Sequence, residues 1–214
     1  MREINKSFGD TKVLRDINLE IPSGSQYVIR GSSGSGKSTL LYLLGGLDQA
    51  GSGEILVDGK DLARVSEDEL ALYRNRMVGF VFQFHFLLPS MDCMKNILLP
   101  SRIGGINLSQ IYERSVELAR HLGVEHCLKK YPFEISGGEQ QRINIIRALS
   151  LRPKLLLCDE PTGNLDSKNS EKVTQILKEL SQEFSATLLV VTHDRKVASQ
   201  FSQEFLIEDG HLCC

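Results

Sequence analysis

The chain has 214 residues, a formal net charge of −2 and 41% hydrophobic residues, which is typical of one large α/β domain. The near-neutral charge excludes the strong basic field of many proteins that bind nucleic acid or anionic lipid, so we expect no nucleic acid partner. No segment approaches the roughly 18 apolar residues that cross a bilayer, and the first residues lack the apolar core of a signal peptide. We therefore expect a cytosolic protein without direct membrane insertion, which reaches any membrane through a partner.

The first third of the chain reads as strands that lead into a helix. Ile17, Leu19 and Ile21 alternate with polar residues and predict a strand, which the Pro-Ser-Gly-Ser turn at 22–25 closes. A short apolar run at 27–29 predicts a second strand, and the apolar run at 40–44 predicts a helix.

The loop between this strand and this helix carries the pattern Gly-x-x-x-x-Gly-Lys-Ser. Such a loop is a phosphate-binding loop when a strand precedes it and a helix follows it, as here. Its backbone N–H groups cradle phosphates, Lys37 would reach the β- and γ-phosphates, and the Ser38 hydroxyl would coordinate Mg²⁺. The Lys-Ser-Thr end and both flanks argue against a flexible Ser/Gly linker. The predicted nucleotide-binding residues of this loop are Gly31, Ser32, Ser33, Gly34, Ser35, Gly36, Lys37, Ser38 and Thr39.

The middle of the chain changes from strand to helix. Residues 54–60 predict a short strand running into a turn, and the apolar run 78–82 predicts a buried strand. From about 84 to 150 helical spacing dominates, with Ser109 as a plausible N-cap and Gly123 as a plausible stop. The apolar face of that helix would consist of Ile111, Leu118, Ala119 and Leu122.

The final third returns to alternating strands and helices. Residues 155–158 and 188–191 predict strands, and between them one helix face is lined by Val173, Ile176, Leu177 and Leu180. This alternation predicts a mainly parallel sheet with helices on its faces. A helical insertion between the two halves of a P-loop core is then the natural architecture.

Two acids, Asp159 and Glu160, follow the apolar strand at 155–158. A carboxylate at the C-terminal end of such a strand faces the ligand crevice of an α/β sheet. Asp159 fits the acid that anchors Mg²⁺, and Glu160 is placed to accept a proton from an attacking water. Two surface acids at the start of a loop would be an equally good interpretation if the P-loop were not present upstream.

The segment Ser-Gly-Gly-Glu-Gln-Gln-Arg at 136–142 precedes a helical run at 143–149. Ser136 would cap that helix, and Gly137 and Gly138 would let a phosphate approach its free N–H groups. By local physics alone, an ordinary glycine-containing helix start is as good an interpretation.

Taken in order, these motifs resemble those of the nucleotide-binding subunits of ABC transporters. Phe8 matches the aromatic residue that stacks on adenine, where the family more often has Tyr. Gln83 matches the Q-loop glutamine, and residues 136–140 resemble the signature, with Ile135 in the usual Leu place. Asn164, Leu165 and Asp166 resemble the D-loop, and His193 matches the switch histidine. In isolation His193 would more often be a loop histidine, Phe8 a core aromatic and Gln83 a solvated strand end.

This resemblance implies a P-loop NTPase (RecA-like) core with an antiparallel β subdomain and an inserted α-helical subdomain. One ABC ATPase domain would cover 1–214, with the core and β subdomain at about 1–83 and 151–214 and the helical subdomain at about 84–150. The implied cofactors are ATP and Mg²⁺, and the implied assembly is a homodimer. The implied catalytic residues are Glu160, His193, Gln83 and Lys37, and the implied metal ligands are Ser38, Gln83 and Asp159. Beyond the P-loop, the implied nucleotide-binding residues are Phe8, Ser136, Gly137, Gly138, Glu139 and Asp166.

Two further segments resemble the MacB/LolD/FtsE group, namely Gly-Gly-Leu-Asp at 45–48 and Gln-Phe-His-Phe-Leu-Leu-Pro at 83–89. The second segment is most similar to the LolD type, although Phe86 stands where that type often has a second His, and Ala50-Gly51 replaces a usual Pro-Thr. That resemblance implies release of lipoproteins from the bacterial inner membrane, a location on its cytoplasmic face, and permease partners of the LolC/LolE type. A MacB-like export ATPase and an FtsE-like signalling ATPase are the alternatives.

The apolar stretch from Phe84 to Met91 exceeds what a solvated loop needs. Together with the family resemblance, this favours docking of a partner's helix over packing inside the helical part of the chain. The five cysteines, Cys93, Cys127, Cys158, Cys213 and Cys214, are scattered without a C-x-x-C pair, so their spacing suggests neither a disulfide framework nor a zinc site.

Overall fold

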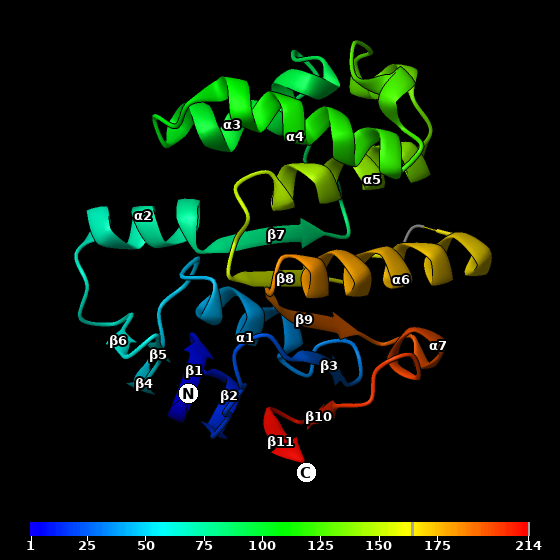
Figure 1. The fold of residues 1–214 in the computed structure, drawn as a ribbon. Helices are drawn as coiled ribbons and strands as arrows, with labels where there is room; N and C mark the ends of the chain where they lie inside the picture. Colours follow the sequence, from blue (N-terminus) through cyan, green and yellow to red (C-terminus); the bar gives the residue numbers. More distant parts are fainter. Residues whose placement is uncertain (164, 214) are drawn as a thin grey trace.

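The computed structural model describes residues 1–163 and 165–213, except the side chains at positions 167 and 168. Its centre is a six-stranded sheet in the order β11-β10-β3-β9-β8-β7 (Figure 1). Every pairing in this sheet is parallel except that of β11 with β10. The strands are β3 (Gln26–Arg30), β7 (Val78–Phe82), β8 (Leu155–Asp159), β9 (Thr187–Thr192), β10 (Glu204–Glu208) and β11 (His211–Cys213).

The central strands are buried on both faces, which explains their continuous apolar sequences. In β8, Leu156 and Cys158 face one core cluster, which also contains apolar residues of α3 (Cys93–Ile103), α5 (Gly137–Leu149) and α6 (Ser167–Glu183). Leu157 faces a second cluster, which contains the leucines of α1 (Lys37–Leu44). The strands predicted at 27–29, 78–82, 155–158 and 188–191 are confirmed as β3, β7, β8 and β9.

A smaller antiparallel sheet, in the order β2-β1-β4, covers the α1 side of the molecule. It consists of β1 (Arg2–Phe8), β2 (Thr11–Ile17) and β4 (Ser52–Glu54). The strand predicted through 17–21 is wrong, because β2 ends at Ile17 and Leu19 exchanges backbone hydrogen bonds with Met1 in a loop. The strand running into a turn that was predicted at 54–60 is confirmed in part, because the strand is interrupted at Ile55 and the turn follows at 58–59. The chain turns between two short strands, β5 (Leu56–Val57) and β6 (Lys60–Asp61), with Asp58 in the left-handed region.

Helices form a layer above the β7 side of the sheet (Figure 1). The layer contains α3, α5, α4 (Leu108–His121), η1 (Glu125–Cys127) and η2 (Pro132–Glu134). The predicted apolar face of α4 is confirmed, because Ile111, Leu118, Ala119 and Leu122 are buried. Its N-cap is Asn107 and not Ser109, since Asn107 Oδ1 accepts a hydrogen bond from the Ser109 N–H. Gly123, with φ of +68°, follows the helix end as predicted.

Two further helices pack beside the sheet, α2 (Glu67–Arg76) against its edge strand β7 and α7 (Arg195–Ala198) against the interior strands β3 and β9. The sequence did not predict α2, because the helix is largely polar and buries only Leu70, so it has no apolar stripe. Its start is nevertheless marked by a capping box of Ser66 and Glu69. Among the described residues, no helix is both long and apolar enough to cross a membrane.

Candidate functional site

Five of the predicted site segments begin where a parallel strand ends. The P-loop follows β3, Gln83 follows β7, and His193 follows β9, while Asp159 ends β8 and Glu160 comes next. Because parallel strands point the same way, these residues gather at one edge of the sheet, at the carboxyl ends of β3, β7, β8 and β9. The register places Phe82 beside Asp159 and Asp159 beside Val191.

The P-loop ends in a helix start that no side chain caps. Gly36 is the N-cap of α1, with φ of +104°, a conformation that a residue with a Cβ rarely adopts. The first N–H groups of α1 therefore point out of the helix without a side-chain partner, which is the arrangement that binds anions at helix N-termini.

Lys37 folds back over the same loop. Its Nζ donates hydrogen bonds to the carbonyl oxygens of Gly31 (3.0 Å) and Ser32 (2.8 Å), and the residue is 7% exposed. A buried ammonium group thus lies inside the loop, where it adds full positive charge to the partial charge of the helix start.

Asp159 joins the strand β8 to α1 through two hydroxyl groups. Ser38 Oγ donates to its Oδ1 at 2.8 Å, and Tyr42 OH donates to its Oδ2 at 2.8 Å. Burial, followed by this bond to Asp159, raises the pKa of Tyr42 to about 12. Tyr42 was not predicted as a site residue, although it lies one helical turn after Ser38 and therefore on the same face of α1.

The carboxylate of Glu160 is held by the residues at the end of β9. Its Oε2 accepts a hydrogen bond from Thr192 Oγ1 (2.8 Å), and its Oε1 accepts one from the His193 backbone N–H (2.9 Å). The Nδ1 atom of His193 lies 2.7 Å from the same Oε1. Glu160 has φ of +45°, so the chain bends sharply at the residue after Asp159. Sequence reasoning missed Thr192, which reads as the last residue of an apolar strand.

A small cavity of about 120 Å³ opens beside Glu160 and His193 and is also lined by Gly163 and Ser170. Gln83 reaches this region, since a Cβ on Gly163 would lie 2.7 Å from its Nε2.

Asp166 caps α6 by accepting a hydrogen bond from the Asn169 N–H at 3.0 Å. Asn164, which the sequence placed in the same segment, lies outside the described residues.

The start of α5 is built as a capping box, as predicted for Ser136. Ser136 Oγ accepts a hydrogen bond from the Glu139 N–H (3.4 Å), and Glu139 Oε2 accepts one from the Ser136 N–H (2.8 Å). A Cβ on Gly137 would meet nothing within 4 Å, and one on Gly138 would meet only Arg142 at 3.9 Å. The surface around both glycines is therefore open to a ligand.

Two buried polar residues of α5 connect it to the strand ends. Gln141 Nε2 donates to the Pro161 carbonyl at 2.5 Å, next to the acidic pair, and Gln141 is 1% exposed. Arg147 donates to the carbonyl oxygens of His85 and Phe86, both at 2.8 Å. Burial lowers the pKa of Arg147 to about 10. Neither residue was singled out from the sequence.

The remaining predicted residue, Phe8, lies at the end of β1 and is 54% exposed. The Lys6 ammonium lies 4.9 Å from the centre of its ring. An exposed aromatic face is available here for stacking against a planar ligand.

The chain matches the family model described as "ABC transporter" over residues 14–163. It is 41% identical to the lipoprotein-releasing system ATP-binding protein LolD of Bdellovibrio bacteriovorus, covering 97% of this chain and 96% of that protein. It is also 41% identical to the LolD protein of Shewanella oneidensis, covering 99% of this chain and 94% of that protein.

The solved structures that the chain resembles are also ABC transporter cassettes. The dimeric structure of the bacterial ABC transporter cassette MJ0796 has a TM-score of 0.90 and 36% identity, with 99% of this chain and 94% of that chain covered. A post-hydrolysis structure of the same cassette, bound to ADP and Pi, has a TM-score of 0.89 at the same identity and coverage.

The capping box of α5 predicts how the free energy of unfolding changes at low pH. Hydrogen bonds from the Ser136 hydroxyl and N–H, with His126 next, lower the pKa of Glu139 from 4.5 to about 2. A carboxylate whose pKa is lower in the folded state stabilises the fold above its unfolded pKa, and this contribution is lost as the pH falls from about 4.5 towards 2. Glu139→Gln can keep the cap but does not titrate. We expect its free energy of unfolding, measured by urea denaturation, to fall less over this pH range than that of the wild type. Parallel curves would contradict this role.

Proposed function

The chain belongs to the ABC transporter family, as its motifs and its P-loop NTPase fold predicted, and on this basis we propose how it uses ATP and what that drives. It is an ATP-binding subunit and an ATPase. We propose that it hydrolyses ATP as a homodimer, bound to permease subunits at the cytoplasmic face of the inner membrane, and that this drives the release of lipoproteins. The observation that carries the proposal is the Glu160 carboxylate, held beside His193 at the sheet edge that holds the P-loop.

The position of Glu160 supports a role as the general base. A carboxylate has about four acceptor sites, and Thr192, the His193 N–H and the His193 ring engage three of them. Among the described residues these are the partners of the carboxylate, which leaves one acceptor site to take a proton from a water that attacks the γ-phosphate, and the three bonds fix the direction in which that site points. We propose that the His193 ring, next to Glu160, also contacts that phosphate, and that Gln83, which follows β7, takes part from the other side.

The Mg²⁺ site fits the residues predicted for it. Ser38 Oγ and Asp159 Oδ1 lie 2.8 Å apart, and hydroxyl and carboxylate oxygens are the ligands that Mg²⁺ prefers. We propose that Ser38, Asp159 and Gln83 hold the ion together with ATP. When bound, Mg²⁺ neutralises charge on the phosphate oxygens.

The position of the signature supports a dimer. The described residues of the capping box contact η1 within their own chain, and no hydrogen bond joins them to the P-loop. The free surface at Gly137 and Gly138 is thus available to a nucleotide held by a second copy. The cassette MJ0796, which this chain resembles, is described as dimeric. We propose the same sandwich here, with Phe8 stacked on the adenine and with Asp166 near the nucleotide.

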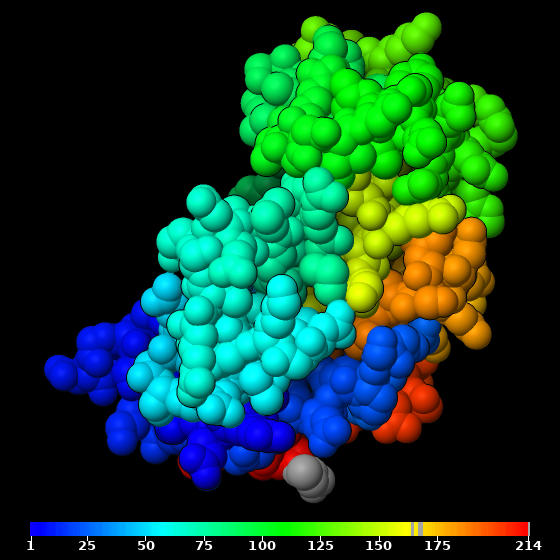
Figure 2. Space-filling view, turned by 60° about the vertical axis from the view of Figure 1, so that its left-hand side comes forward, coloured from blue at the N-terminus to red at the C-terminus, as the bar shows by residue number. Residues whose placement is uncertain are grey.

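The likeness to two LolD proteins supports lipoprotein release and LolC/LolE-type partners. We propose that such a partner docks beside the loop at 84–86, which we call the aromatic loop. A groove of about 460 Å³ runs between α2, β7, α3 and α5, lined by Phe82, Ile103 and Arg147 among others. Figure 2 views the molecule from this side, where the surface is hollowed between the α2 segment and the helical layer. Phe84 and Phe86 are each 63% exposed, which favours partner docking over internal packing. We place the boundary of the helical subdomain at about 84–150.

The base assignment is tested by Glu160→Gln. Removal of a general base lowers the turnover rate by about 10²–10⁴, while the P-loop and its Lys37 remain to bind ATP. We expect the variant to bind ATP with near wild-type affinity by calorimetry, to form a dimer with ATP by size-exclusion chromatography, and to have almost no phosphate release. Lys37→Ala is the control and should weaken ATP binding itself. Full turnover by the Glu160 variant would contradict the assignment.

The role of Thr192 is tested by comparing Thr192→Val with Thr192→Ser. Valine keeps the shape but cannot donate to Glu160 Oε2, whereas serine retains the hydroxyl. We expect kcat of the valine variant to fall about tenfold, equivalent to about 1.4 kcal/mol, with little change in KM, and the serine variant to resemble the wild type. Equal losses in both variants would mean that packing and not the hydrogen bond matters.

The partner proposal is tested by purification of the chain from native membranes. We expect it to bring down polytopic permease subunits, and we expect Phe84→Ser with Phe86→Ser to lose them while retaining ATP binding. Depletion of the chain should leave lipoproteins in the inner membrane, measured by membrane fractionation. Partner recovery without such retention would favour an export or signalling ATPase over lipoprotein release.

A further inference from the structure

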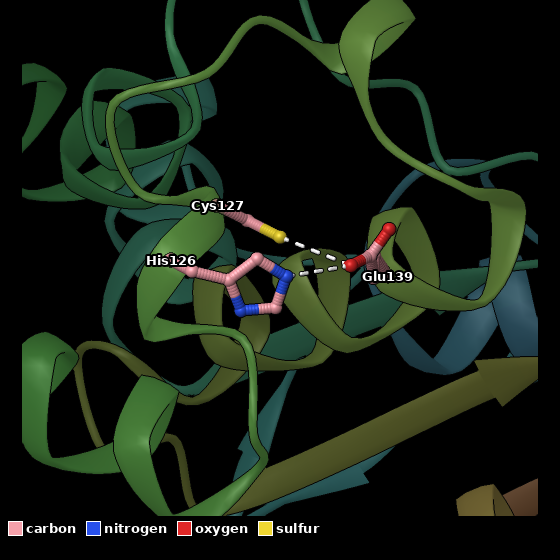
Figure 3. A group of neighbouring side chains, drawn as sticks. All are labelled: His126, Cys127 and Glu139. Atoms are coloured by element: carbon pink, nitrogen blue, oxygen red, sulfur yellow. Dashed lines mark hydrogen bonds and ion pairs between the residues drawn. The ribbon is translucent and has the colours of Figure 1, made fainter.

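Beside the signature helix, three side chains with metal-ligating atoms converge from two elements (Figure 3). His126 and Cys127 lie in η1, and Glu139 lies in the first turn of α5. His126 Nε2 lies 2.8 Å from Glu139 Oε1, and Cys127 Sγ lies 3.4 Å from the same oxygen. The three ligand atoms all lie within 4.8 Å of one another.

From this geometry we propose that His126, Cys127 and Glu139 form a binding site for a divalent transition-metal ion of the zinc class. The donors are one nitrogen, one sulfur and one oxygen, a set that suits Zn²⁺ and not Mg²⁺, which takes oxygen ligands. Zn²⁺ binds His, Cys and carboxylate ligands at about 2.0 to 2.3 Å. Ligand atoms around a tetrahedral ion lie about 3.3 to 3.6 Å apart. A small shift that moves His126 Nε2 and Glu139 Oε1 apart, with Cys127 Sγ near its present distance from Oε1, therefore lets one ion replace the hydrogen-bonding protons that now link the three atoms.

The site has a buried side and an open side. Cys127 is 0% exposed, whereas the His126 side chain is 57% exposed and that of Glu139 is 20% exposed. An ion can therefore enter from the His126 side and reach the sulfur below. Three protein ligands leave a fourth position, which water can fill on the open side.

Metal binding leaves the cap of α5 in place, because the two oxygens of Glu139 have separate partners. Oε2 accepts from the Ser136 N–H (2.8 Å) and the Ser136 hydroxyl (2.6 Å), and only Oε1 faces His126 and Cys127. An ion on Oε1 would cross-link η1 to the first turn of α5. It would stabilise the folded chain by binding it in preference to the unfolded chain.

The cobalt-substituted protein provides the sharpest test, because a thiolate-to-Co²⁺ absorption band arises only when sulfur is a ligand. The probe is Co²⁺ added to the reduced, full-length protein without nucleotide and without a polyhistidine tag. We expect this band in the wild type, its disappearance when Zn²⁺ is added in competition, and a Zn²⁺-dependent rise in unfolding temperature. Oxygen ligands at the Mg²⁺ site cannot produce the band.

Three variants assign the ligands. His126→Ala changes an exposed side chain, so it should fold normally and lose both the band and the Zn²⁺-dependent stabilisation. Cys127→Ser should do the same, and Cys213→Ser is the matched control that should keep both. Absence of the band in the wild type, or its persistence in Cys127→Ser, would overturn the proposal. The three residues would then be only a hydrogen-bond network that orients Glu139. Neither result depends on ATP hydrolysis, so the test is separate from that of the proposed function.

Discussion

The arrangement of the site depends on four parallel strands that end at the same edge of one sheet. Because β8 lies between β7 and β9, the residues after each strand approach Asp159 from both sides. Side chains alternate along a strand, so Glu160 would point away from Asp159 if β8 continued. The left-handed bend at Glu160 ends the regular strand and turns this side chain towards the end of β9, while its N–H still bonds to the Val191 carbonyl at 2.9 Å. Two adjacent acids thereby take different neighbours, Asp159 facing α1 and Glu160 facing the end of β9.

A single helix, α5, links the signature, the segment after the acidic pair and the loop at 85–86. Its first turn carries the capping box, its middle reaches the Pro161 carbonyl through Gln141, and Arg147 near its end holds the aromatic loop. Its 13 residues span about 20 Å, at about 1.5 Å per residue. A rigid element with polar anchors at three points cannot tilt without disturbing the acidic pair and the loop together. This gives a physical route between the proposed partner at the groove and the proposed base.

Local signals explain which parts of the fold the sequence predicted. The P-loop, β8 and β9 were predictable because each is specified by consecutive residues, namely a Gly-rich turn or an apolar run buried on both faces. The prediction of Ser109 as the N-cap of α4 was wrong because Asn107 and Ser109 are both good cap residues, and the backbone path selects Asn107. Tyr42, Thr192 and Gln141 were missed because their partners lie between 20 and 117 residues away in sequence. The His126, Cys127 and Glu139 cluster was missed although its members lie only 12 and 13 residues apart, since no cysteine spacing indicates a site that a helix and a short turn assemble.

The position of the Glu139 carboxylate keeps the first N–H groups of α5 available to a phosphate. A carboxylate in the first turn is favourable for the helix but competes with any phosphate for the same N–H groups. Here Glu139 bonds to the N–H and hydroxyl of Ser136, outside the helix proper. Within the described part of the chain, the amides of Gly137 and Gly138 donate no hydrogen bond, so they remain available to an anion. The other oxygen of Glu139 is engaged by His126 and Cys127, which turns its negative charge away from the glycines. The cluster in η1 therefore helps to keep the open end of α5 attractive to phosphate.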